Sequence, residues 1–179
     1  MGPRARKLAL TAHVVFTVGW LGAVGCSLVL AIAGVASTDP EIVRATYLAM
    51  QLVGWWLLVP LSLASLFTGL VQALGTSWGL FRHYWVLIKL LMNVFASAVL
   101  LLYMQQLEHL ARAVGDSTLT ERQLLEVGTP SPIVHAGGAL MLLLVAVTLS
   151  VYKPRGMTRY GQRKQRGRLA NPGRAVRGG

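Results

Sequence analysis

The stretch LALTAHVVFTVGWLGAVGCSLVLAIAGVAST, residues 8–38, contains no Lys, Arg, Asp or Glu. A helix needs about 20 mainly apolar residues to cross a hydrocarbon core about 30 Å thick, and this stretch is long enough to do so. Three further stretches without these charged residues follow, at residues 45–81, 90–107 and 127–152. The pattern predicts four transmembrane helices.

The composition of the whole chain supports this prediction. Of its 179 residues 54% are hydrophobic and 13% are charged, and the mean hydropathy of +0.56 argues against a water-soluble monomer. Backbone groups in lipid must be paired within helices or a closed barrel, and the sequence has none of the alternating segments of about 10 residues that build a barrel. The predicted fold class is therefore all-α, a polytopic bundle of four transmembrane helices. A single cysteine, Cys26, excludes an internal disulfide and a Cys-x-x-Cys-His haem attachment.

Capping signals set the predicted boundaries. Asp39 before Pro40, and Ser131 before Pro132, are typical of helix starts. We predict a transmembrane domain over residues 1–152, with spans at about 8–35, 45–74, 84–107 and 132–152. The outer loop, residues 108–131, contains a capping box from Thr118 to Glu121 that predicts a short helix on the membrane surface.

The distribution of charge predicts the orientation of the spans. Fourteen of the 17 basic residues lie before the first span, in or beside the second connection, or after the fourth span. All six acidic residues lie in the other two connections, with only Arg44, Arg112 and Arg122. Because Lys and Arg near span ends are retained on the cytoplasmic side, both termini are predicted to be cytoplasmic.

An alternative is that residues 4–36 form a cleaved secretory signal, since Ala31, Ala33 and Ala36 follow the first apolar run. A signal core usually has about 7–15 apolar residues, and here more than about 20 uncharged residues precede those alanines. The length favours a retained span. The other three spans are predicted in either case.

Residues 153–179 form a basic tail with nine basic residues and no acid. With almost no apolar periodicity the tail is predicted to be disordered. Attraction to anionic headgroups is worth about 1 kcal/mol per basic residue near a membrane surface. Nucleic-acid binding is not expected, because no folded motif or aromatic interleaving accompanies the charge. The predicted headgroup contacts are Lys153, Arg155, Arg159, Arg163, Lys164, Arg166 and Arg168.

Small residues mark predicted helix contacts. Helices in lipid associate through small side chains that let their backbones approach, so Gly22 with Cys26, and Ser65 with Gly69, are interpreted as packing pairs. Pro60 removes a backbone donor near the middle of the second span and predicts a kink there.

Lys89 and His13 are the polar residues that most need an explanation. Lys89 lies six residues after His83, and His13 lies six residues after Lys7, on helices that both run outward from the cytoplasm. At about 1.5 Å per residue the two side chains should lie at the same depth, about 9 Å beyond the basic edge. A charged lysine at this depth is costly unless it has a role or a partner.

Helical spacing extends each of these residues into a polar stripe. His13, Thr17 and Trp20 share one face of the first span, and Lys89, Asn93 and Ser97 share one face of the third. Facing stripes would form a cytoplasmic-side cavity that could hold water, a proton path, or haem b with His13 as an axial ligand. The alternative is that Lys89 extends its amine to headgroups and that His13 donates to a neighbouring carbonyl.

Two further histidines lie on the predicted outer side. His109 follows the third span and His135 begins the fourth, so the two could form part of a metal site with Glu108 or Glu126. No HxxxH or HExxH spacing supports such a site, which needs three or four convergent ligands. Ordinary interfacial histidines are the alternative.

Two short motifs resemble those of small bacterial helical membrane proteins. They are His13 with Trp20-Leu21-Gly22, and Trp85-x-x-x-Lys89-Leu90. This group is similar in these motifs to copper-resistance D-type proteins and HemJ-type protoporphyrinogen oxidases of haem synthesis, and an uncharacterised four-helix family is the nearer match. The resemblance implies a bacterial inner membrane location. In the HemJ-type proteins a first-helix histidine and a later lysine serve haem binding and activity, which implies such roles for His13 and Lys89.

Two functions follow as hypotheses. The first is a non-catalytic or accessory membrane protein that contacts a membrane-protein partner or a second copy of itself, since the sequence contains no complete catalytic set. The second is a haem- or metal-binding redox protein, because His13 and Lys89 are predicted at matched depth.

Overall fold

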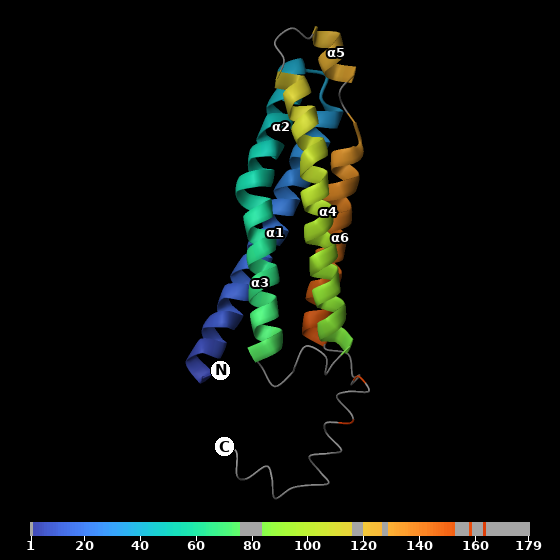
Figure 1. Ribbon diagram of the computed structural model, residues 1–179. Coiled ribbons are helices and arrows are strands. Elements are labelled where there is room, and N and C mark those ends of the chain that lie inside the picture. The colour runs from blue at the N-terminus through green and yellow to red at the C-terminus, as the bar shows by residue number, and fades with distance from the viewer. Residues whose placement is uncertain are drawn as a thin grey trace, which may run out of the picture.

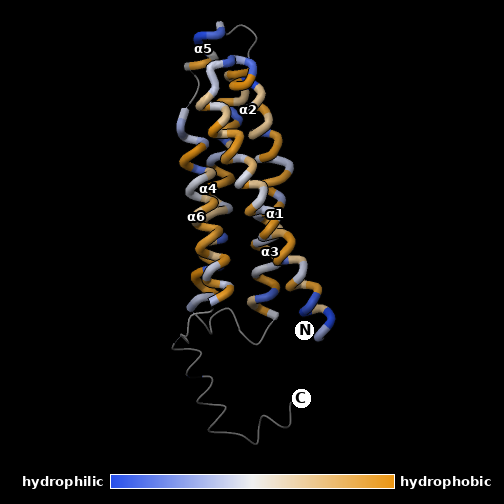
Figure 2. Tube along the Cα trace, turned by 180° about the vertical axis from the view of Figure 1, so that it is seen from behind, coloured by the Kyte–Doolittle hydropathy of each residue, from blue (hydrophilic) through white to orange (hydrophobic). Residues whose placement is uncertain are grey.

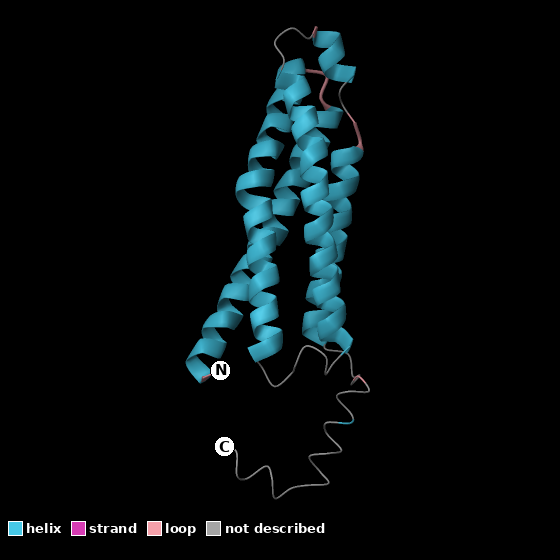
Figure 3. Cartoon of the chain, viewed as in Figure 1, coloured by secondary structure: helices cyan, strands magenta, loops and turns pink. Residues whose placement is uncertain are grey.

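The computed structural model describes residues 2–75, 84–115, 120–126 and 129–152, together with Thr158 and Arg163. Over these residues the chain is helical and has no strand (Figure 3). The elements in chain order are α1 (Pro3–Ala36), α2 (Pro40–Val53), the π-helical turn η1 (Gly54–Leu58), α3 (Val59–Gly75), α4 (Tyr84–Gly115), α5 (Glu121–Glu126) and α6 (Ser131–Tyr152).

Four helices in the described part of the chain are long and apolar enough to cross a membrane. They are α1, the continuous run from α2 through η1 to α3, α4, and α6. The all-α prediction with four long apolar helices is therefore confirmed. The helices extend past the predicted spans: α1 already begins at Pro3, and α4 continues to Gly115.

The four long helices form an antiparallel bundle (Figure 1). The start of α1, the end of α3, the start of α4 and the end of α6 lie at one end, and α5 lies at the other. Helix α1 packs against α2, α3 and α6, while α4 packs against α2, α3 and α6. Each of these two helices therefore bridges the α2–α3 run and α6.

Hydrophobic residues run along all four long helices (Figure 2), and many large apolar side chains are exposed on the outer surface. Leu102 is 68% exposed, Phe67 67% and Val151 71%. The interior includes polar side chains, since Ser62 and Ser65 are both 0% exposed. The outer surface of a water-soluble bundle is instead mainly polar.

Two clusters of buried apolar residues fill the interior. One lies toward the α5 end and contains Val43, Tyr47, Met50, Met104 and Leu107, among others. The other is centred on Trp20 and contains Ala23, Val24, Leu58 and Leu143. The backbone N–H of Thr129, just before α6, donates to the Tyr47 hydroxyl over 3.1 Å, which ties the outer loop to the first cluster.

A π turn lies immediately before Pro60. The N–H of Val59 donates to the carbonyl of Gly54, five residues earlier. Proline has no N–H, and its ring collides with the carbonyl four residues before it in a regular α-helix. The wider turn at Gly54–Leu58 is the local distortion at the place where the sequence predicts a kink.

The small pair Gly22 and Cys26 does not pack against another helix. Both residues are exposed, and a Cβ built on Gly22 meets no atom within 4 Å. The interpretation of this pair as a helix contact within the chain is therefore wrong, because this face of α1 points out of the bundle. Close approach occurs at Gly34 instead, where a Cβ would lie 2.7 Å from the Thr46 Oγ1 of α2.

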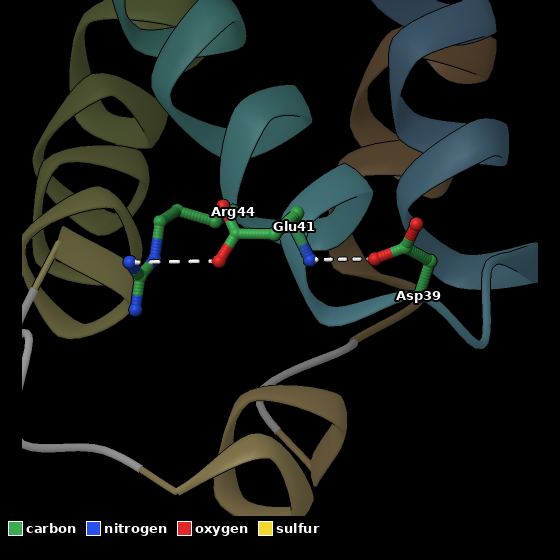
Figure 4. A network of polar contacts seen from close by, with 3 residues as sticks. All are labelled: Asp39, Glu41 and Arg44. Carbon is green, nitrogen blue, oxygen red and sulfur yellow. Dashed lines mark hydrogen bonds and ion pairs between the residues drawn. The ribbon is translucent and has the colours of Figure 1, made fainter.

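The tight turn between α1 and α2 is held by polar caps (Figure 4). The Asp39 carboxylate accepts from the Glu41 N–H over 2.9 Å, and Glu41 faces Arg44 at 3.9 Å. The N–H of Asp39 donates to the Ser37 hydroxyl over 3.0 Å. In the outer loop the N–H of Thr120 donates to the Gln123 side chain over 3.0 Å, which caps α5 at Thr120.

Some predictions fall outside the described residues. They concern the basic tail, including Lys153, Arg155, Arg159, Lys164, Arg166 and Arg168, and the predicted cap residue Thr118. Of the predicted headgroup contacts the structure describes Arg163, which is exposed.

We expect the Asp39 cap to contribute to stability. Replacing Asp39 with Ala removes the acceptor for the Glu41 N–H and should lower the free energy of unfolding by about 1 kcal/mol. Thermal unfolding of the purified protein in detergent measures the effect. Asp39→Asn, which keeps a side-chain oxygen, is the control and should unfold close to wild type; equal losses for both variants would contradict the cap.

Candidate functional site

Ser65 of α3 is the point at which polar side chains from three helices meet. Its hydroxyl lies 3.0 Å from the Thr17 hydroxyl of α1, and the Asn93 amide of α4 donates to it over 3.2 Å. Ser65 is 0% exposed, so these contacts are sheltered from competition by solvent. The Ser97 hydroxyl continues the chain of contacts to Asn93 at 3.5 Å.

His13 of α1 binds the same part of α3. Its Nδ1 lies 3.1 Å from the Ser65 carbonyl and 3.1 Å from the Thr68 hydroxyl. A carbonyl oxygen only accepts, so Nδ1 carries the proton in this arrangement. The Thr68 hydroxyl donates to the Ala64 carbonyl over 2.7 Å, which leaves its oxygen to accept from His13. In the neutral ring Nε2 is then an acceptor with a free lone pair.

Gly69 provides the space for the His13 ring. A Cβ built on Gly69 would lie 3.1 Å from the His13 Cε1, closer than ordinary van der Waals contact. The predicted packing pair Ser65 and Gly69 therefore does face another helix. One member bonds to the ring and the other makes room for it.

Lys89 of α4 lies near this network. Its side chain is half-buried, and its Nζ lies 5.5 Å from the centre of the Trp85 ring. A cation over the face of a tryptophan ring is stabilised by the negative face of the ring. Of the five predicted cofactor-binding residues, His13, Thr17 and Asn93 meet at Ser65, and Lys89 lies one helical turn before Asn93 on α4.

Trp20, the fifth, lies elsewhere. It is 1% exposed and packs in the apolar cluster with Ala23, Val24, Leu58 and Leu143. It continues the face of α1 that carries His13 and Thr17, but this face meets apolar side chains one turn further along. Trp20 is thus part of the core and not of the polar network.

The polar contacts of α3 were not predicted from the sequence, which indicated only a packing role for Ser65 and Gly69. Ser65 and Thr68 supply the contacts to α1 and α4, and the Gln72 amide donates to the Ala9 carbonyl of α1 over 2.9 Å. The signal was present, because these residues recur at the spacing of one helix face. A serine in such a stripe also fits simple close packing, and the sequence does not distinguish the two.

The two outer histidines are separated along the bundle. His109 is exposed on α4, whereas the His135 ring stacks on Tyr103 at 4.2 Å between ring centres and 17° between planes. Tyr103 precedes His109 by six residues, about 9 Å along a helix. In the described part of the chain no three His, Cys, Asp or Glu side chains gather as a metal site would require.

The network has two chemical properties. It joins three helices through hydroxyl, amide and imidazole groups that are paired with one another, and it includes one imidazole whose Nε2 can present a lone pair. The first property stabilises the bundle, and the second would suit a metal ligand.

No family model, curated protein or solved structure matches the chain. The resemblance to copper-resistance D-type and HemJ-type proteins thus depends on the residues of the two short motifs alone.

We expect Gly69→Ala to disturb the network, because the added methyl group would press on a His13 ring held by two hydrogen bonds. Gly22→Ala is the matched control: its Cβ enters open space, so the better helix propensity of alanine should leave stability unchanged or higher by up to about 1 kcal/mol. Thermal unfolding in detergent should give a lower midpoint for Gly69→Ala than for wild type.

The same substitution in a His13→Ala background tests the mechanism. The added methyl group then has space, so the penalty should disappear. An equal loss in both backgrounds would show that Gly69 is needed for a reason other than the His13 ring.

Proposed function

We propose that this chain is a multi-pass protein of a bacterial inner membrane, with both termini in the cytoplasm, and that it is a non-catalytic or accessory component of that membrane. The observation that carries the proposal is that polar groups in the interior are hydrogen-bonded to one another. Thr17, Ser65, Asn93 and Ser97 bond to one another across α1, α3 and α4. Groups paired in this way hold helices together and are not presented to a substrate.

The distribution of apolar side chains supports insertion in lipid. Leu102 and Val151 are largely exposed on helices long enough to cross a membrane, and this exposure is costly in water. The charge pattern supports the orientation, since the basic residues Arg4, Arg6 and Lys7 open α1 whereas Asp39 and Glu41 lie in the turn at its far end.

The partners that fit this proposal are lipid and protein. The basic tail, residues 153–179, is suited to anionic headgroups on the cytoplasmic surface. A membrane-protein partner or a second copy of the chain would pack on the apolar outer faces. Nucleic acid is not expected, for lack of a binding motif in the sequence.

The single natural cysteine makes the topology directly testable. In a Cys26→Ser background we expect Thr38→Cys, in the α1–α2 turn, to react with a membrane-impermeant maleimide added to intact spheroplasts. Ala5→Cys, near the start of α1, should react only after lysis. Both positions are exposed in the bundle, so reactivity depends on the membrane alone. The reverse pattern would overturn the orientation, and recovery of the protein in the soluble fraction would overturn insertion.

A second function, haem b binding, is favoured by a specific feature of His13. Its Nδ1–H bonds to the Ser65 carbonyl, and metal-binding histidines commonly use this bond to orient the ring and direct Nε2 to the metal. Lys89 supplies a nearby positive charge that would suit a haem propionate. In this hypothesis His13 would hold the iron through Nε2 and Lys89 would pair with a carboxylate, and haem iron would supply one-electron redox chemistry.

A visible absorption spectrum distinguishes the two functions. If haem b binds, protein purified after haem-replete expression should show a Soret band that His13→Ala removes and His109→Ala retains, since His109 is exposed and distant from the network. The absence of the band, or a band unaffected by His13→Ala, would remove the haem hypothesis and leave the accessory role.

A further inference from the structure

The four long helices differ in length, and this difference decides how much of each fits within a membrane. Helix α6 has 22 residues and is therefore about 33 Å long, close to the hydrocarbon thickness of about 30 Å. Helix α1 has 34 residues, α4 has 32, and the run from α2 to α3 has 36, which gives lengths of about 48 to 54 Å. These three helices therefore extend past α6.

Contacts between helices show that the extra length lies at the outer end, toward α5. His135 of α6 stacks on Tyr103 of α4, so Ser131, one turn before His135, is level with Leu107. The part of α4 after Leu107 thus lies beyond the start of α6. At the opposite end of the bundle, the ends of the four helices lie close to one level (Figure 1).

The same level can be found on the other two long helices. Gly54 of η1 packs against Met104 of α4, so the part of α2 before Gln51 lies beyond the start of α6. Gly34 of α1 packs against Thr46 in that part of α2, so the last turns of α1 lie beyond it too. These outer ends of α1 and α2 carry exposed apolar side chains, namely Ile32, Val35, Ile42 and Leu48.

On the side of the bundle formed by α4 and α6, the exposed apolar surface is shorter. It runs from Ile88 to Leu102 on α4 and from Val134 to Val151 on α6, over about 21 Å and about 26 Å. The large side chains exposed further along α4 are polar: they are Gln105, Gln106, His109 and Arg112. The apolar height of this side therefore fits a bilayer.

The opposite side, formed by α1 and the run from α2 to α3, is apolar over a greater height. We call this side, from Leu8 to Val35 on α1 and from Ile42 to Leu74 on the run, the tall apolar face. Its helices are apolar over about 40 Å and about 48 Å, which exceeds the hydrocarbon thickness by about 10 Å or more. Apolar surface beyond the hydrocarbon costs free energy, and this cost favours association between membrane helices.

We propose that two copies of this chain pair through their tall apolar faces. A second copy has a face of the same height, so pairing covers the part that lipid leaves exposed. The sides formed by α4 and α6, whose apolar height fits the bilayer, then face the lipid. Two helices each about 10 Å wide, over a height of about 40 Å, give about 800 Å² per copy, the size of a standard stable interface. The pairing depends on the membrane insertion proposed above.

Gln51 gives the pairing a self-complementary polar contact. It lies beside Leu48 and Leu52 on the tall apolar face and is partly exposed. Its side-chain amide has no hydrogen-bond partner within the described part of the chain. An amide both donates and accepts, so the Gln51 amides of two copies related by a twofold axis can bond to each other. Polar side chains that bond between helices in this way hold membrane helices together.

Cysteine cross-linking tests the pairing in native membranes. In a Cys26→Ser background we expect Ile32→Cys, on the tall apolar face, to form a covalent dimer when the membranes are treated with copper phenanthroline. His109→Cys is the control, because it is exposed at a similar level on α4, and it should remain monomeric. Equal amounts of dimer from the two positions, or no dimer from either, would overturn the proposal.

An exposed tryptophan allows a test that leaves the fold of each copy intact. Trp56 of η1, on the tall apolar face, is 80% exposed, and Tyr152 at the end of α6 is 79% exposed. Trp56→Ala should weaken association about tenfold, because buried aromatic side chains dominate the free energy of interfaces. Energy transfer between labelled full-length copies in lipid vesicles measures the affinity. Tyr152→Ala is the matched control and should associate like wild type, and a Trp56→Ala variant that does the same would contradict the proposed face.

Bilayer thickness tests the physical cause of the pairing. Long-chain dierucoyl phosphatidylcholine covers more of the tall apolar face than short-chain dimyristoyl phosphatidylcholine, so energy transfer should be lower in the thicker bilayer. Association that is equal or stronger in the thicker bilayer would overturn this cause. A chain that inserts with the proposed orientation but shows no energy transfer in either lipid would refute the pairing alone, whereas recovery in the soluble fraction would refute the proposed function as well.

Discussion

The contacts of Ser65 are the constraint on which the arrangement of this bundle depends. If the bundle lies in lipid, as proposed above, the hydrophobic effect provides little attraction between its helices, because the acyl chains are as apolar as the side chains that they replace. Helix association must then come from close packing and from hydrogen bonds between polar side chains, because no water is present to pair with these groups. Ser65 provides both, since it bonds to Thr17 and Asn93 through its hydroxyl and to His13 through its carbonyl. These contacts connect α1, α3 and α4 at the level of Ser65.

Much of this arrangement could be predicted from the sequence, because hydropathy and charge act on whole segments. Long uncharged runs can only be accommodated as helices, and Asp39 before Pro40 marks a helix start wherever it occurs. The similar depth of His13 and Lys89 also follows from simple counting along two helices. In the structure His13 bonds to Ser65, and Ser65 also bonds to Asn93, which lies one helical turn after Lys89.

The rest could not be predicted because it depends on how each helix is rotated about its axis. Gly22 with Cys26 and Ser65 with Gly69 have the same small-x-x-x-small spacing, yet the first pair faces outward and the second faces His13. Trp20 follows Thr17 on one face of α1 and still enters an apolar cluster. Residue spacing identifies a face, but the neighbour that the face meets is set by packing between distant segments.

The π turn sets how α3 is rotated about the helix axis relative to α2. Met50, Gly54, Leu58 and Ser62 are all buried and follow one another in three steps of four residues. A regular α-helix has 3.6 residues per turn, so repeated steps of four would carry these residues progressively off the interior face, and one extra residue corresponds to a rotation of about 100°. The wide turn at Gly54–Leu58 absorbs that residue. Met50, which precedes Pro60 in the chain, and Ser62 and Ser65, which follow it, therefore all face the interior of the bundle. The distortion that Pro60 imposes therefore allows one continuous helix to pack in the apolar cluster of Tyr47 and Met50 with its first half and to anchor the polar network with its second.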